Sequence, residues 1–346
     1  MESAPTGFVV ECGFLWVAQG GVHMWGYVFR RVVGWFFIVI AAVSIPFLIF
    51  YLSPGSLPII WGSMADPDEF VRDFREIHRL DYPIFIRYVR YIFGVFTGDF
   101  GLSFRTWEPI APQIAQRLPY TLQLGVLSLV ASLILVLPLG ILVAINKNSL
   151  SDKMVKAAEI IGNSTPVFLI AMVLVAFFLV ERGSTAPNPL YGRRAGLGPR
   201  YNDILILPSI ALGFGLFLAM LHTVRDSFLE IMAKPYIKLA RSKGISKGRV
   251  LIKHVLRNTF IAILSTLRTR LGEFFVGIIM VEYIFLRSGI GRFIIQGIMA
   301  RDYPRTIGGI VVFIFGYAIL NILIDITQAL IDPRVKEQGG WQGSPS

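Results

Sequence analysis

The sequence predicts an all-α integral membrane protein, and three observations lead to this fold class. Hydrophobic residues make up 54% of the 346 residues, charged residues only 16%, and the mean hydropathy is +0.64. This composition is too apolar for a soluble globular chain of such length. Apolar stretches of membrane-crossing length recur along the chain, and a strongly basic segment lies between two of them. We therefore expect a bundle of membrane-spanning helices with a charged helical segment at one surface.

Six stretches are predicted to span the membrane. A helix needs about 20 apolar residues to cross about 30 Å of hydrocarbon, and four charge-free stretches meet this requirement. Two further stretches contain charged residues and are otherwise apolar. In chain order the predicted spans are residues 32–52, 118–146, 160–180, 204–224, 259–286 and 306–331.

The placement of lysine predicts the orientation of these spans. Six spans put both termini and the loops after spans two and four on one side, and all nine lysines fall there. Because cytoplasmic loops are enriched in Lys and Arg, both termini are expected in the cytoplasm. The expected parts are a cytoplasmic tail at 1–28, the first span with an external segment at 29–118, a transmembrane domain at 119–331 and a cytoplasmic tail at 332–346.

Two segments outside the spans carry separate expectations. Residues 1–23 fit no span and are expected to be a tail, with Met24 as an alternative start of the chain. Within the external segment, the apolar spacing of residues 67–79 predicts an interfacial or capping helix.

The basic segment at residues 234–258 is expected to form a helical hairpin in the cytoplasm. It carries eight Lys and Arg residues and no Asp or Glu. Pro235 suits the first position of one helix, Gly244 suits the left-handed position that ends it, and Ser246 can cap the next helix. A charged hairpin held between spans is a docking surface rather than a catalytic site. The alternative is a loop that is basic only because cytoplasmic loops generally are.

Motifs for catalysis and for nucleotide binding are absent from the sequence. It contains no G-x-x-x-x-G-K-[ST] phosphate loop, no histidine pair spaced for a metal and no G-x-S-x-G motif. We therefore expect a chain that is not an enzyme and that binds no metal or cofactor. The net charge of +11 could also suit a nucleic acid, but the long apolar stretches favour a lipid bilayer as partner. The energy for its action would come from a partner protein or a gradient.

Short motifs along the chain resemble those of one membrane protein family. The basic segment contains Y-x-x-x-A-R-x-K-G followed by H-x-L-R-N, formed by Tyr236, Ala240, Arg241, Lys243, Gly244, His254, Leu256, Arg257 and Asn258. Further blocks in matching order include Gly98-Asp99-Phe100-Gly101, Ser164-Thr165-Pro166, Gly289-Ile290-Gly291 and Arg301-Asp302-Tyr303-Pro304. From residue 24 to residue 336, the chain resembles a permease subunit of the dipeptide/oligopeptide branch of ATP-binding-cassette (ABC) importers.

The resemblance implies a type-1 importer permease core, formed by spans two to six, in the cell inner (plasma) membrane. Its partners would be a second homologous permease subunit, two cytoplasmic ATPase subunits that bind ATP and magnesium, and an external substrate-binding protein. The basic hairpin would dock into a cleft of the ATPase through the motif residues named above. The cargo would be di- or oligopeptides, with oligosaccharides, nickel chelates or glutathione as alternatives. A secondary transporter is the alternative from another class.

Charged residues within the spans form a second candidate site. A charge near mid-bilayer costs at least about 2.5–3.5 kcal/mol, so each should face a cavity, a partner subunit or an opposite charge. In span five, Arg270 and Glu273 are three residues apart and can pair, whereas Arg268 lies about 160° from Arg270 around the helix. We expect the Arg270–Glu273 pair to face the translocation cavity, and Arg268 to reach the membrane surface or the partner permease. An interfacial or mutually neutralised set is the alternative.

Three further polar residues in spans five and six match family positions. The resemblance favours a role in holding helices together, with contact to the translocation path as the alternative. These residues are Glu282, Asn321 and Asp325.

Overall fold

The structure is a computed structural model that describes residues 26, 29–49, 72, 76–77, 81–177, 205–243, 246, 248 and 255–331. Within these residues the chain forms α-helices and no β-strand, apart from an isolated bridge between Leu102 and Pro109. The predicted all-α class is therefore confirmed. The long helices are Phe29–Ile49, α5 (Ile110–Ile145), α8 (Ile206–Ala233), α11 (Arg257–Ile284) and α13 (Tyr303–Ile331). The shorter helices are α4 (Ile84–Thr97), α6 (Leu150–Ser164), α7 (Val167–Val175), α9 (Pro235–Ser242) and α12 (Ile290–Met299).

Four of the described helices are long and apolar enough to cross a membrane, namely Phe29–Ile49, α5, α8 and α13. They correspond to the first, second, fourth and sixth predicted spans. The fifth span corresponds to α11, which is as long as α8, at 28 residues, but carries Arg268, Arg270 and Glu273. The helices also run beyond the apolar stretches, because a helix can continue into water after its apolar part has ended at the membrane surface.

The third predicted span, at residues 160–180, is divided between two helices, α6 and α7. α6 ends at Ser164, and α7 begins after Pro166. Thr165 between them is extended, with φ of −101° and ψ of 114°. A residue before proline is forced away from the helical region, and proline itself lacks the N–H that would continue the helix. The apolar composition predicts the span, and Pro166 within it indicates the position of the break.

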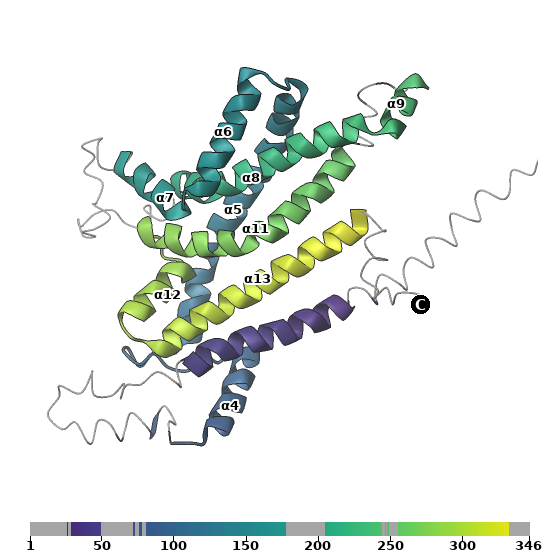
Figure 1. Cartoon of the computed structure of the whole chain (residues 1–346). Helices are drawn as coiled ribbons and strands as arrows, with labels where there is room; N and C mark the ends of the chain where they lie inside the picture. The colour runs from purple at the N-terminus through teal and green to yellow at the C-terminus, as the bar shows by residue number, and fades with distance from the viewer. Residues whose placement is uncertain are drawn as a thin grey trace, which may run out of the picture.

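α8 lies at the centre of the bundle and contacts α5, α6, α7, α9 and α11 (Figure 1). Small residues let α5 and α8 approach closely. A Cβ atom added to Gly140 would lie 2.5 Å from Cγ1 of Val224. The hydroxyl of Ser132 donates a hydrogen bond to the carbonyl of Gly213 at 3.1 Å. Such residues are typical of helix contacts in membranes, where apolar burial against lipid gives little driving force.

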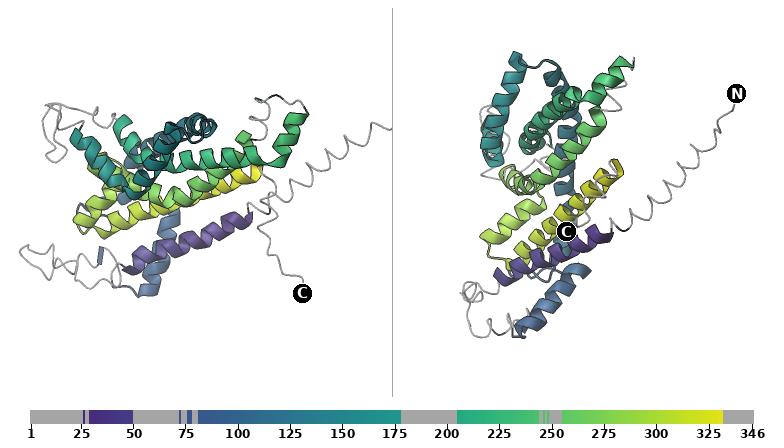
Figure 2. Two further views of the ribbon diagram at one scale, coloured as in Figure 1. Left: turned by 45° about the horizontal axis from the view of Figure 1, so that its top comes forward. Right: turned by 45° about the vertical axis from the view of Figure 1, so that its right-hand side comes forward.

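The helix Phe29–Ile49 lies beside α13 on one side and near α4 on the other (Figures 1 and 2). Val43 of this helix forms a buried cluster with Val95 of α4 and Val311 of α13. α4 has 14 residues, too few to cross the membrane, and was not among the helices predicted from the sequence. The helix predicted at residues 67–79 lies almost entirely outside the described residues.

Asp302, in the motif at residues 301–304, contacts the turn that follows the motif at residues 98–101. Its buried carboxylate accepts hydrogen bonds from the Ser103 hydroxyl at 2.5 Å and the Phe104 N–H at 3.1 Å. Gly98 and Gly101 have φ values of 78° and 77°, which a side chain would strain. These glycines allow the tight turns between α4 and α5, and Asp302 fixes the turns against the start of α13.

Candidate functional site

The first part of the basic segment lies at one end of the bundle, where α9 follows α8 (Figure 1). α8 ends at Ala233, Lys234 is extended with ψ of 140°, and α9 begins at Pro235. The predicted position of Pro235 at the start of a helix is confirmed. Proline is suited to this position because the first N–H groups of a helix have no intrahelical partner.

Ile237 anchors α9 to the bundle. Its side chain is fully buried in an apolar cluster whose other members are Ala144, Phe228, Ile231 and Val255. Tyr236 and Leu239 of the same helix are exposed. A short helix that is fixed on one side and exposed on the other has the form that a docking surface requires.

The structure places the remaining motif residues of this hairpin only in part. Ala240 and Arg241 lie in α9, and Lys243 follows the helix and is exposed. Gly244 and His254 lie outside the described residues. The predicted turn at Gly244 therefore stays a prediction.

The last two motif residues lie at the start of α11. Nε of Arg257 donates a hydrogen bond to the carbonyl of Ile331 at 3.2 Å, and Asn258 is exposed. The Arg257 contact ties the start of α11 to the end of α13. Movement of the basic segment would therefore act directly on both helices.

A cavity of about 450 Å³ lies among α6, α7, α8 and α11. Arg270 and Glu273 line it from α11, halfway along that helix. Nη1 of Arg270 lies 2.9 Å from Oε2 of Glu273, so the pairing predicted from their spacing is confirmed. The Arg270 side chain is 34% exposed and that of Glu273 is 69% exposed. Both charges are therefore accessible from the cavity.

The other residues around this cavity are mostly apolar or glycine. From the junction of α6 and α7 they are Gly162, Ser164, Thr165, Pro166, Val167 and Phe168. From α8 and α11 they are Leu212, Gly215, Leu216, Gly272, Phe274, Val276, Gly277 and Met280. An ion pair in such surroundings is the feature that a ligand with charged groups could recognise.

Arg268 is held by its own chain. Its Nη1 atom lies 2.6 Å from Oδ1 of Asp325 in α13, and Nε of Arg31 lies 3.2 Å from Oδ2 of the same carboxylate. The expectation that Arg268 would reach the membrane surface or a partner permease is thus replaced by an ion pair that joins α11 to α13. The sequence did not predict this pair because the two residues are 57 positions apart. Asn321, also in α13, donates to the carbonyl of Tyr317 in the same helix at 2.8 Å.

Glu282 is fully buried and holds three helices together. Oε1 accepts a hydrogen bond from the Thr121 hydroxyl of α5 at 2.7 Å. Oε2 accepts from the N–H groups of Gly291 and Arg292 at the start of α12, at 2.7 and 3.3 Å. A Cβ atom added to Gly289 would lie 2.0 Å from Oε1, which explains a glycine in this motif. These contacts favour the helix-holding role for Glu282 over contact with cargo.

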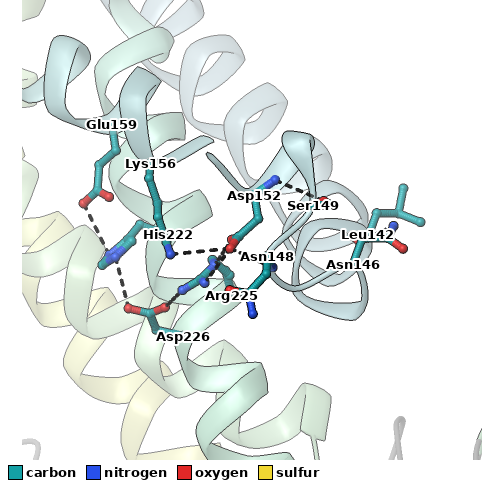
Figure 3. Close-up of polar contacts among 10 residues, drawn as sticks. All are labelled: Leu142, Asn146, Asn148, Ser149, Asp152, Lys156, Glu159, His222, Arg225 and Asp226. Atoms are coloured by element: carbon teal, nitrogen blue, oxygen red, sulfur yellow. Dashed lines mark hydrogen bonds and ion pairs between the residues drawn. The ribbon is translucent and has the colours of Figure 1, made fainter. Parts of the chain in front are cut away.

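Asp152 and Arg225 form a buried ion pair that was not predicted from the sequence (Figure 3). Nε and Nη2 of Arg225 lie 2.5 and 3.1 Å from the two oxygens of Asp152. Hydrogen bonding from Arg225 lowers the pKa of Asp152 to about 2. Ser149 caps the start of α6, and its hydroxyl accepts a hydrogen bond from the Asp152 N–H at 3.3 Å. The spacing of these two residues resembles a capping box, so the cap could have been predicted from the sequence. The ion pair with Arg225 of α8 could not be predicted from the sequence.

His222 extends this charged network along α6 and α8 (Figure 3). Its Nδ1 atom lies 3.3 Å from Oε1 of Glu159, and its Nε2 atom lies 3.0 Å from Oδ2 of Asp226. Asp226 also contacts Arg225. The network joins the helix that precedes the Pro166 break to the helix that leads into α9.

Comparisons with known proteins identify the family. Residues 136–337 match the family described as "Binding-protein-dependent transport system inner membrane component", and residues 24–125 match "Binding-prot-dependent transport system membrane comp, N-term". The chain belongs to this family. It is a multi-pass inner-membrane permease subunit of an ABC importer, as the sequence motifs predicted.

Individual relatives cover nearly the whole permease. The chain is 31% identical over 314 residues to "Glutathione transport system permease protein GsiC" of Escherichia coli (strain K12), which covers 90% of this chain and 99% of the relative. It is 29% identical over 311 residues to "Probable peptide ABC transporter permease protein y4tP" of Sinorhizobium fredii, with the same coverage.

Membership of this family indicates which functions belong to this chain and which belong to partner subunits. The permease is not an enzyme, since ATP hydrolysis belongs to partner subunits, and it acts in a membrane complex with an ATPase and a binding protein. These findings confirm the predicted class of function. The roles of individual residues in docking and in the translocation path stay predictions.

Proposed function

We propose that this permease forms half of the translocation path of an importer for di- or oligopeptides. The observation that carries this function is the cavity beside α11, where an acid and a base face a mostly apolar space of about 450 Å³. Peptides combine apolar side chains with charged termini, and such a lining suits both. The names of these relatives, which refer to glutathione and to peptide transport, support peptidic cargo over oligosaccharides or nickel chelates.

The proposed complex contains a second homologous permease subunit, two cytoplasmic ATPase subunits and an external binding protein. ATP and magnesium bind to the ATPases, and this chain holds no cofactor. Both termini lie in the cytoplasm, on the side of the basic segment. The placement of all lysines supports this orientation.

Coupling is proposed to run through α9 and the residues that follow it. α9 is anchored by Ile237 and exposes Tyr236, so it can transmit a push from a docked ATPase to α8. Arg257 ties the start of α11 to α13, so the other end of the basic segment can move these two helices together. Such rigid-body rotation would alternate the access of the cavity between the two membrane sides.

The test is transport by the complete complex in proteoliposomes. Uptake of a labelled tripeptide should require ATP, both kinds of permease, the ATPases and the binding protein. Labelled oligosaccharide and chelated nickel should not accumulate. Uptake that persists without ATP and follows a proton or sodium gradient would instead support a secondary transporter.

A further inference from the structure

The break between α6 and α7 lies in the wall of the cavity that contains Arg270 and Glu273. Ser164 and Thr165 at the end of α6 line this cavity, and so do Val167 and Phe168 at the start of α7. α7 and α11 are in contact (Figure 1). Residues of the helix break and of the ion pair line the same cavity. The two features are separated by more than 100 residues in the sequence and meet only in the fold.

The broken helix offers two electrostatic poles. The first N–H groups of a helix have no intrahelical partners and carry partial positive charge, whereas its last carbonyl groups carry partial negative charge. In this cavity the start of α7 therefore favours an anion, and the end of α6 favours a cation. Interrupted helices in membrane transporters use the same principle to bind charged cargo. The side chains of Arg270 and Glu273 add one full charge of each sign.

Two glycines leave part of the cavity lined by bare backbone. A Cβ atom added to Gly215 of α8 or to Gly272 of α11 would meet nothing within 4 Å. By contrast, a Cβ atom on Gly277, which also lines the cavity from α11, would lie 2.9 Å from Cδ1 of Leu212. Gly277 thus serves close packing, whereas Gly215 and Gly272 keep space open.

We propose that this cavity selects cargo carrying both a free carboxylate and a free ammonium group. The carboxylate binds at Arg270 and the start of α7, and the ammonium binds at Glu273 and the last carbonyls of α6. This inference rests on the proposed function and adds the chemical class of the cargo. When such a zwitterion enters, each charge of the ion pair exchanges one opposite charge for another, so neither is left alone in the membrane. A cargo with one blocked terminus lacks one of these replacements and is disfavoured.

The experiment measures protection of a single cysteine by defined peptides. Val276 lines the cavity and is exposed, so a Val276→Cys variant in a Cys12→Ser background reports on occupancy. The probes are trialanine, N-acetyl-trialanine and trialanine amide, added to the assembled importer in each nucleotide state. Trialanine should slow labelling by an aqueous thiol reagent about tenfold, and each blocked probe should slow it less than about twofold.

Charge variants give a result that a purely structural ion pair would not. Glu273→Gln should lose protection by trialanine and gain protection by N-acetyl-trialanine, because only the anionic terminus still finds its partner. Arg270→Gln should show the reverse and favour trialanine amide. A merely structural role predicts that both variants lose protection by trialanine without gaining protection by either blocked probe.

A matched pair of glycine variants tests the space itself. Gly215→Leu should fill the cavity and abolish protection by every probe. Gly34→Leu is the control, since Gly34 is also a helical glycine with nothing within 4 Å but lies in the helix Phe29–Ile49, away from the cavity. Both variants should co-purify with the complex.

Three outcomes would overturn the inference: equal protection by blocked and free probes, unchanged probe selectivity in the charge variants, or no protection in any nucleotide state. Uptake of trialanine by the same preparation separates this failure from a failure of the proposed function. If uptake occurs without charge-dependent protection, only the selection site is wrong. If no peptide is taken up, the proposed function is wrong.

Discussion

Arg225 and Asp152 show how single residues stabilise the transport domain. The pair joins α6 to α8, and both side chains are buried. Removing one partner leaves the other charge buried without its main counter-ion, whereas removing both leaves an apolar contact. The structural role of these residues can therefore be separated from a role in transport.

We predict that Arg225→Met lowers the melting temperature of the purified complex, and that the double variant Arg225→Met/Asp152→Leu recovers most of the loss. Thermal unfolding in detergent, followed by fluorescence, measures this. The single variant Asp152→Leu is measured as well. If the double variant lowers the melting temperature by the sum of the two single decreases, the ion pair is not the source of the effect.

The same pair gives a pH dependence. The pKa of Asp152 is lowered in the folded state to about 2 from its ordinary value of 3.8. Its stabilising contribution is therefore present above about pH 4 and is lost as the pH falls towards 2. In the double variant this loss should be absent.

The two charged pairs of α11 should respond differently to neutralisation. Glu273→Gln removes the carboxylate that contacts Arg270 in the cavity, and should change peptide uptake or the basal ATPase rate. Arg268→Gln still leaves Asp325 its contact with Arg31, so it should affect transport less. Rates measured on both variants in one membrane preparation decide this. A larger effect of Arg268→Gln would place the functional charge at the α11–α13 contact instead.

At the scale of elements, the short helix α12 is held in place through backbone contacts. Gly289 precedes α12 and lies against the carboxylate of Glu282. Gly289→Ala would push a methyl group into that carboxylate and should cost about 1–3 kcal/mol, the range for overpacking a core. Unfolding in denaturant, compared with Gly34→Ala as control, measures the cost. An effect equal to that of the control would show that the backbone shifts freely here.

The basic segment contains the turn predicted to orient the docking surface. Gly244→Val denies the positive φ that this turn is expected to need, so the second helix of the hairpin should be misplaced. Uptake should fall by at least about tenfold while membrane insertion and α9 persist. Unchanged uptake in the reconstituted complex would exclude Gly244 from the coupling mechanism.

Elements differ in how far the sequence reveals them. Long apolar stretches made the helix Phe29–Ile49, α5, α8 and α13 predictable, because crossing the membrane requires about 20 apolar residues. The pairing of Arg270 with Glu273 followed from helical spacing. The contact between Arg268 and Asp325 and that between Asp152 and Arg225 were not predictable, since they join positions 57 and 73 residues apart. The role of the Pro166 break also depends on the cavity that only the fold creates.

In the whole molecule, the basic segment and the cavity are connected through the same two helices, α8 and α11. α8 lines the cavity with Gly215 and leads into α9 at its end. α11 carries Arg270 and Glu273 and starts at the far end of the basic segment. A displacement of the basic segment by a docked ATPase would therefore move two walls of the cavity. We therefore propose that this permease couples its partners to cargo movement through α8 and α11.

ATP-dependent uptake by the Gly215→Leu and Gly34→Leu variants tests whether cargo passes through the cavity between α8 and α11. The complete importer, carrying either Gly215→Leu or Gly34→Leu, is reconstituted in proteoliposomes and supplied with labelled trialanine and ATP. We predict that Gly215→Leu lowers uptake by at least about tenfold while the docked ATPases still hydrolyse ATP, and that Gly34→Leu leaves uptake unchanged. Equal uptake by the two variants would show that cargo does not pass through the cavity between α8 and α11, and would contradict the account.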